Sequence, residues 1–149
     1  MPRVRMNDEE VARRLEDCEL VRVAFHDGTT TYLIPLGCIW DNGALYGVAD
    51  PGRKTEIAKQ NPRVAFQTDT ARETGLFEWE SVTGQGDFDI VSDPGEISRA
   101  MAKLQPFVET APDWWKEEQG PKMSSGQLLV WRIRPSLTTG VRYTRPGGA

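Results

Sequence analysis

The sequence is poor in the residues that side-chain catalysts and metal sites most often use. It contains one histidine, His26, and two cysteines, Cys18 and Cys38. A single histidine argues against histidine-based catalytic triads and multi-histidine metal sites. The two cysteines have neither a metal-ligand nor a redox-motif spacing, and each stands beside apolar residues. We therefore expect two free, buried thiols, as in a reducing compartment, and no metal site.

Long hydrophobic runs and an excess of positive charge are also missing. No stretch approaches the ~20 apolar residues of a membrane span. The first 18 residues lack the apolar core of a signal peptide, so a cytoplasmic location and no membrane partner are expected. The net charge of -4 and pI near 5.1 argue against a nucleic-acid partner. The chain has no internal repeat and no low-complexity segment.

The composition is that of an ordinary globular protein. Hydrophobic residues make up 38% of the 149 residues and charged residues 27%. This length is sufficient for a core without disulfides or metal. The sequence predicts one domain over residues 1–149, with its core at 8–135 and a tail at 144–149.

The first 40 residues show the periods of one helix and two strands. Asn7 is a good N-cap for a helix over 8–17. Residues 19–26 alternate like a strand and end at His26, which we interpret as a rim residue. After a turn at 27–28, a β-rich run over 29–40 is interrupted by Pro35 and Gly37. These two residues indicate a bend, needed either for barrel closure or for facing a ligand.

The later part of the chain alternates strands with helices. The pattern predicts a loop at 70–75, a long strand at 77–90, and a helix from Pro94 that Pro106 stops. Two acids near the start of this strand, Glu78 and Glu80, indicate that their face is exposed to water there. A short helix then begins at Pro112, followed by a loop at 120–126, a strand at 128–133 ended by Pro135, and a short edge strand at 137–143.

Adjacent Trp114 and Trp115 cannot both face one core, so one of them is expected to close a pocket or meet a partner chain. Taken together, the elements predict a mainly β fold, an antiparallel barrel of six to seven strands with peripheral helices.

The stretch 43–66 has the features of an anion cradle. A short strand, a tight loop and a helix that starts with Arg53 and Lys54 follow one another. Helix N-termini offer unpaired N–H groups and the positive end of the dipole, where cations are unfavourable unless an anion binds. Solvated surface charge is the alternative interpretation of the same two residues.

Two segments carry a resemblance to a known family. They are CELVRVAFHDGTTTYLIPLGCIWDNGALYGVADPGRKTEIAKQNPRVAFQTDT and WESVTGQGDFDIV. Their most specific part is Gly-Arg-Lys at 52–54 followed by Asn-Pro-Arg-Val at 61–64. The chain resembles the pyridoxamine 5′-phosphate oxidase-like, FMN-binding split barrels, and among them the small single-domain, nitroimidazole-reductase-like branch.

The resemblance implies a cofactor site. Arg53 and Lys54 would hold the FMN phosphate, and Val48, Ala49 and Asp50 would complete the cradle. The strand from Tyr32 to Leu36 would run under the flavin ring, and its backbone groups would meet the ring at Leu33, Ile34, Pro35 and Leu36. The family places the flavin at a homodimer interface, so Trp79, Ser81 and also Trp131 would come from the partner chain. Many members carry hydroxyl side chains where this chain has Ala49 and Asp50, and an acid there repels phosphate unless it turns away or pairs with Arg53.

The function implied is that of an FMN-dependent oxidoreductase acting on an unknown small molecule. The flavin would supply the redox chemistry, which suits a chain without an evident catalytic constellation. Deazaflavin is an alternative cofactor, for which Arg13, Arg14, Arg63 and Arg72 are candidate contacts. Haem, with His26 as ligand, and a non-enzymatic flavin-binding or storage protein are the others. Substrate pockets would be built from residues 70–75 and 107–119.

Overall fold

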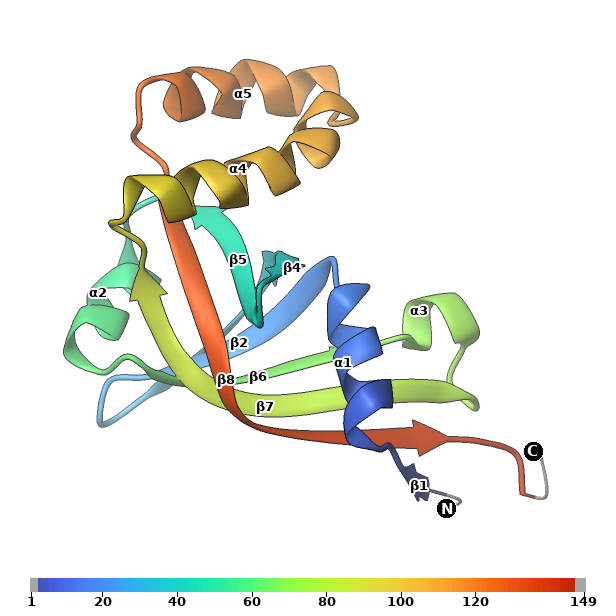
Figure 1. The fold of residues 1–149 in the computed structure, drawn as a ribbon. Helices are drawn as coiled ribbons and strands as arrows, with labels where there is room; N and C mark the ends of the chain where they lie inside the picture. Colours follow the sequence, from blue (N-terminus) through green and yellow to red (C-terminus); the bar gives the residue numbers. More distant parts are fainter. Residues whose placement is uncertain (1–2, 147–149) are drawn as a thin grey trace.

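A computed structural model describes residues 3–146 of the chain (Figure 1). Residues 147–149 of the predicted tail lie outside the described residues. The elements follow one another as β1 (Arg3–Arg5), α1 (Asp8–Glu16), β2 (Leu20–His26), β3 (Thr31–Gly37), β4 (Ile39–Asp41), β5 (Ala44–Ala49), α2 (Arg53–Gln60), β6 (Arg63–Asp69), α3 (Ala71–Thr74), β7 (Trp79–Ile90), α4 (Pro94–Glu109), α5 (Asp113–Ser124) and β8 (Leu129–Tyr143).

All strands join one curled antiparallel sheet. Its order is β3-β2-β6-β7-β8-β5-β4, and β1 pairs with β8 off this path. The long strands β7 and β8 run the whole length of the sheet and bend it, with a register shift between Gln85 and Gly86 (Figure 1). The predicted mainly β, antiparallel split barrel is confirmed.

The barrel closes where β3 approaches β5. A Cβ atom at Gly47 would lie 2.6 Å from the carbonyl oxygen of Gly37 and 2.5 Å from the ring of Trp131. Only glycine at position 47 therefore lets the end of β3 and the indole ring lie directly against β5. This contact brings the C-terminal end of β3 beside the strand that leads into α2.

Alternating side chains of the strands fill the interior. On β2 the buried residues are Val21, Val23 and Phe25, as their spacing predicted. Phe88 packs edge-on against Phe25 at 5.0 Å and stacks on Trp131 at 5.4 Å between ring centroids. Aromatic rings from three strands thus make the centre of the core.

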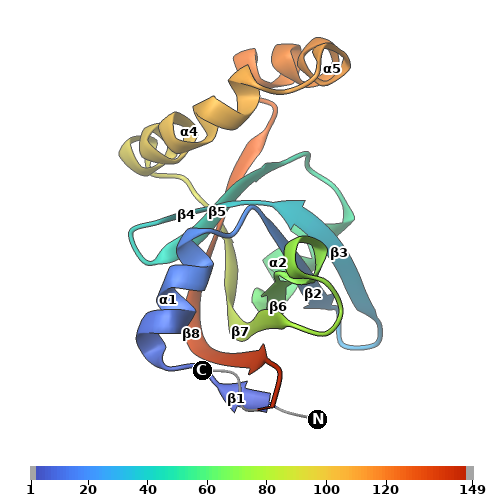
Figure 2. The same ribbon diagram turned by 90° about the vertical axis from the view of Figure 1, so that its right-hand side faces the viewer.

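Helices cover the ends of the barrel. Helix α1 begins at the predicted N-cap, because Asn7 Oδ1 accepts the N–H of Glu10 at 2.9 Å. Helices α4 and α5 lie together at one end, while β1 and the end of β8 lie at the other (Figures 1 and 2). Glu96 fixes α4 to the sheet by accepting hydrogen bonds from Tyr46 at 2.6 Å and from Arg132 at 2.6 Å.

Three predictions about the helices were wrong. Residues 71–74, expected in a loop, form the short helix α3. Helix α4 continues through Pro106 to Glu109, and α5 continues through Pro121 to Ser124. A proline inside a helix costs about 3 kcal/mol, yet both helices continue past their prolines. The N–H of Thr110 donates to the Pro106 carbonyl at 3.3 Å, and the N–H of Ser125 donates to the Pro121 carbonyl at 3.0 Å. Local propensity alone does not predict these continuations.

The last strand was also predicted incorrectly. Pro135 does not end it, because β8 runs unbroken to Tyr143 and pairs with β7, β5 and β1. Residues 137–143 therefore continue this strand. Residues 141–143 lie between β7 and β1, whereas 137–139 pair with β7 alone. Pro135 lies opposite Gly86, at the register shift, where a proline needs no ladder hydrogen bond. The pairing of β1 with β8 was not predicted from the sequence.

Candidate functional site

The strand, loop and helix start that the anion-cradle prediction requires are present, as β5, a three-residue loop and the first turn of α2. No side chain caps the helix N-terminus. Thr55, which is 1% exposed, accepts the N–H of Gly52 at 2.9 Å and donates to the Gly52 carbonyl at 2.8 Å. Its hydroxyl therefore stabilises the loop itself. The N–H groups of the first turn point away from the helix, where an anion would find them.

Arg53 and Lys54 extend from this turn without a carboxylate partner. Among residues 3–146, no acidic side chain forms an ion pair with either. The guanidinium of Arg53 lies over the ring of Tyr32, 5.1 Å from its centroid, which is a cation–π contact between α2 and β3. Two unpaired cations at a helix N-terminus are costly unless an anion binds, so the arrangement favours an anion site.

Asp50 does not lower the positive charge of Arg53 and Lys54 by pairing with them. Its carboxylate lies 3.4 Å from the Nζ of Lys122 on helix α5. The acid is thus drawn toward α5. Of the other two loop positions predicted for the cradle, Val48 is half-buried and Ala49 is buried.

Strand β3 alternates at the residues predicted to meet a flavin ring. Leu33 and Pro35 face outward, and Leu33 is 64% exposed. Ile34 and Leu36 are half-buried and pack against the core. The strand passes through Pro35 without a bend, because β3 pairs on one side only and tolerates a missing N–H at its free edge. The strand ends at Gly37, and Cys38 separates it from β4.

Trp79 and Ser81 lie far from Arg53 within one chain. They stand at the start of β7, next to the end of β6, whereas α2 leads into the start of β6. The six residues between these ends of β6 span about 20 Å. Figure 1 shows α2 and the start of β7 on opposite sides of the barrel. One chain therefore brings Arg53, Lys54, Val48, Ala49 and β3 together, but not Trp79 and Ser81.

Trp131 cannot reach a partner chain, so that prediction was wrong. Its side chain is fully buried in the core of its own chain, against Phe88 and Gly47. The two adjacent tryptophans of α5 face different surroundings, as predicted. Trp114 is 64% exposed, while Trp115 lines a cavity of about 450 Å³ between α4, α5 and the sheet. Val48 and Gly37 line the same cavity, which places it beside the cradle.

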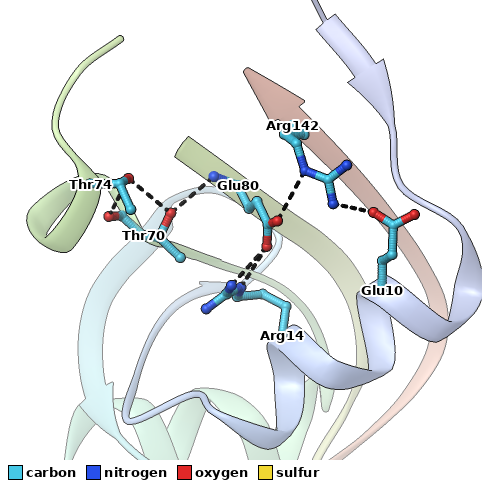
Figure 3. A network of polar contacts seen from close by, with 6 residues as sticks. All are labelled: Glu10, Arg14, Thr70, Thr74, Glu80 and Arg142. Atoms are coloured by element: carbon cyan, nitrogen blue, oxygen red, sulfur yellow. Dashed lines mark hydrogen bonds and ion pairs between the residues drawn. The ribbon is translucent and has the colours of Figure 1, made fainter. Parts of the chain in front are cut away.

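Thr70 and Thr74, from the segment 70–75, line a different cavity of about 240 Å³ at the other end of the barrel. Its wall is a polar network (Figure 3). Glu80 accepts hydrogen bonds from Arg14 at 2.8 Å and from Arg142 at 3.0 Å, and Arg142 also pairs with Glu10. The face of β7 that carries Glu80 is therefore only partly exposed to solvent. Burial opposes ionisation of Glu80, but the two arginines outweigh it and hold its pKa below the ordinary value.

Sequence reasoning missed two contacts that orient the cradle. Tyr32, expected only in the strand under the flavin, lies under Arg53, and Lys122 pairs with Asp50 from a position 72 residues away. No local signal announces either contact, because each depends on how distant elements are placed.

Solved structures with this fold come from several bacteria. A FAD-binding protein from Mesorhizobium loti is 24% identical, covers 97% of this chain and 100% of its own, and superposes with a TM-score of 0.79. A protein from Bacteroides thetaiotaomicron, named as a candidate for 5-nitroimidazole antibiotic resistance, is 15% identical over 95% of this chain and 87% of its own, with a TM-score of 0.71. The haem storage protein HutZ from Vibrio cholerae is 14% identical over 91% of this chain and 94% of its own, with a TM-score of 0.63.

These identities show a shared fold. Among curated proteins, none matches the sequence significantly. Among residues 3–146, no helix is long and apolar enough to cross a membrane. The model of one family, described as pyridoxamine 5′-phosphate oxidase, matches residues 7–142. The chain therefore belongs to the pyridoxamine 5′-phosphate oxidase family.

Proposed function

We propose that this protein binds FMN, with the phosphate at the N-terminus of α2, and acts as an oxidoreductase on a small molecule. The observation that carries the proposal is the pair of unpaired cations, Arg53 and Lys54, beside an uncapped helix N-terminus. The two cations and the free N–H groups of the helix N-terminus fit a dianionic phosphate. Bound flavin would supply the redox chemistry, and the chain would bind it, orient it and exclude water.

The other residues suit this role. Asp50 turns toward Lys122, which reduces its repulsion of a phosphate. Leu33, Ile34, Pro35 and Leu36 lie on the free edge of β3, whose backbone groups have no strand partner on that side. These groups are available to the polar edge of a flavin ring. The cavity lined by Val48 and Trp115 adjoins the cradle and is our candidate for the substrate pocket.

Deazaflavin and haem fit the structure less well. Three arginines offered for a longer acidic cofactor are already paired, Arg13 with Glu9, Arg14 with Glu80 and Arg63 with Asp87. Haem would need His26 as a ligand. That histidine is exposed at the turn between β2 and β3, and its Nδ1 accepts the N–H of Gly28 at 3.0 Å.

The proposal includes a homodimer. Leu33, Ala24, Ala65, Gln85 and Leu137 are aligned across five neighbouring strands on the outer face of the sheet. This row is mostly apolar, and Leu33 and Leu137 at its ends are 64% and 60% exposed. Exposed apolar rows of this kind favour a partner. A second copy on this face would also supply Trp79 and Ser81 to a site that lacks them within one chain.

The test begins with the absorbance spectrum of the purified protein and chromatography of any flavin released on denaturation. We expect an oxidised flavin spectrum and FMN, or quenching of flavin fluorescence when FMN is added to colourless protein. Riboflavin, which lacks the phosphate, should bind much more weakly. Equal binding of the two would contradict the phosphate site, and FAD in the extract would replace FMN as the cofactor.

Reduction separates an enzyme from a storage protein. The loaded protein is mixed anaerobically with NADH or NADPH, and the loss of flavin absorbance is followed. An electron acceptor is then added. We expect reduction and repeated turnover, and a flavin that neither donor reduces would favour storage.

A further inference from the structure

The fold brings the two cysteines into contact, although they are 20 positions apart in the sequence. Cys18 lies between α1 and β2, and Cys38 lies between β3 and β4. Their Sγ atoms are 3.3 Å apart, and both residues are buried in the core, with exposures of 6% and 4%. Both are free thiols.

The sheet holds this pair in place. Strands β2 and β3 pair up to Leu20 and Gly37, and the N–H of Cys38 extends the ladder by donating to the Glu19 carbonyl at 3.0 Å. Cys18 directly precedes Glu19, and Cys38 directly follows Gly37. Both neighbours are held by the ladder between β2 and β3. The two thiols therefore meet at the end of a rigid ladder, and little rearrangement is needed for a bond between them.

The surroundings make the two thiols unequal. The hydrogen bond with Cys38 lowers the pKa of Cys18 to about 7 against the effect of burial, and Thr68 contributes further. The same hydrogen bond, together with burial, raises the pKa of Cys38. Cys18, whose Sγ also lies 3.5 Å from Thr68 Oγ1, is therefore the expected nucleophile of the pair, because the thiolate is the reactive form. Cys38 keeps its proton.

Each cysteine lines a cavity. Cys18 lines one of about 420 Å³ with polar walls that include Asp17, Glu19 and Lys103. Cys38 lines the largely apolar cavity beside Val48 and Trp115. The first cavity brings a small polar oxidant next to Cys18, although that residue is only 6% exposed.

We propose that Cys18 and Cys38 form a modification site, a dithiol that a peroxide converts reversibly to an intramolecular disulfide. The Cys18 thiolate attacks one oxygen of hydrogen peroxide, the O–O bond breaks, and the sulfur becomes a sulfenic acid as hydroxide leaves. The Cys38 sulfur then attacks Cys18 Sγ, the S–O bond breaks, and the proton of Cys38 leaves with the hydroxyl as water. Two thiols and one peroxide thus give one disulfide and two waters.

The test uses the folded wild-type protein. It is treated with hydrogen peroxide, free thiols are blocked with N-ethylmaleimide in denaturant, and the chain is digested with trypsin under non-reducing conditions. Cleavage after Arg14, Arg22 and Arg53 puts the cysteines on separate peptides, 15–22 and 23–53. We expect the oxidised protein to run as a monomer on a non-reducing gel and its digest to contain the two peptides as one linked species. Dithiothreitol should restore both thiols.

Single variants assign the order of attack. Cys38→Ser should accumulate a sulfenic acid at Cys18 that dimedone labels, while Cys18→Ser should leave Cys38 alkylatable after the same treatment. Circular dichroism checks that each variant is folded, and the wild-type peptide map decides the proposal by itself. Two unmodified thiols after peroxide treatment, overoxidation of Cys18 without linked peptides, or links only between chains would each overturn it.

Discussion

The guanidinium of Arg53 lies 5.1 Å above the ring of Tyr32 and joins the first turn of α2 to strand β3. The contact connects the proposed phosphate site to the strand proposed to meet the flavin ring. It holds the cation near the helix N-terminus in the absence of an acidic partner. The two halves of the proposed FMN site are thus in contact within one chain.

Removing either cation of the cradle should weaken FMN binding. Charge-assisted hydrogen bonds of this kind contribute about 1.5–3 kcal/mol each, so Arg53→Ala and Lys54→Ala should each raise the Kd at least tenfold. Flavin fluorescence quenching measures the change. The control is Lys59→Ala, at the other end of the same helix, where Lys59 pairs with Glu56. An equal loss in the control, or no loss in Arg53→Ala, would remove the phosphate site from α2.

The pair of Asp50 and Lys122 should set the affinity of the same site. Lys122→Ala leaves Asp50 without its partner, so we expect weaker FMN binding. Asp50→Asn removes the negative charge and should tighten binding by less than tenfold, since the pair is exposed and screened. The double variant should resemble Asp50→Asn alone, as titrations at low salt would show. Weaker binding in Asp50→Asn would mean that Asp50 contacts the ligand favourably.

A dimer through the outer face should be sensitive to charge on that face. Leu137→Lys places a cation at the end of the exposed row, and we expect the protein to become monomeric in light scattering coupled to size exclusion. Trp114→Lys is the control, because Trp114 is 64% exposed and lies on α5, outside the row. A dimer that persists in Leu137→Lys would place the interface elsewhere.

Core packing predicts different effects for two glycines. A Cβ at Gly84 would press on the Phe66 ring and lie 2.9 Å from the carbonyl oxygen of Leu137. Gly84→Ala should therefore lower the free energy of unfolding by about 1–3 kcal/mol. Gly120 lies inside α5, where an added Cβ would meet no atom within 4 Å apart from its chain neighbours. Because Pro121 follows and disfavours a Cβ in the helical region, Gly120→Ala should change the free energy of unfolding by less than about 1 kcal/mol. Urea unfolding measures both changes, and equal effects would contradict the packing.

The network around Glu80 predicts loss of stability in acid. The pKa of Glu80 is below its ordinary value of 4.5 in the folded chain, so the ionised carboxylate stabilises the fold above that pH. This stability is lost as the pH falls through the lower, folded pKa. Glu80→Gln should lower the free energy of unfolding by about 1–2 kcal/mol at neutral pH and flatten its acid dependence. Glu78→Gln, at an exposed position, should leave the acid slope unchanged in urea titrations at several pH values.

Much of the fold could be predicted because its signals are local. Alternation identified β2 and most of β7, Asn7 marked the start of α1, and the frame of Arg53 and Lys54 identified the cradle. Each signal depends on residues that are neighbours along the chain. The same reasoning failed at Pro106 and Pro135. Local propensity predicted that a helix and a strand end there, but α4 and β8 both continue past these prolines.

The sequence by itself therefore determined the alternating strands such as β2, the start of α1 and the positive charge at the start of α2. The tertiary structure decided what those residues meet. Lys122 turns Asp50 from Arg53, Tyr32 supports that arginine, and Trp131 is enclosed by its own chain. Cys18 and Cys38, which have no motif spacing, touch because the ladder of β2 and β3 ends between them. Such contacts depend on distances across the sheet, which no spacing along the chain encodes.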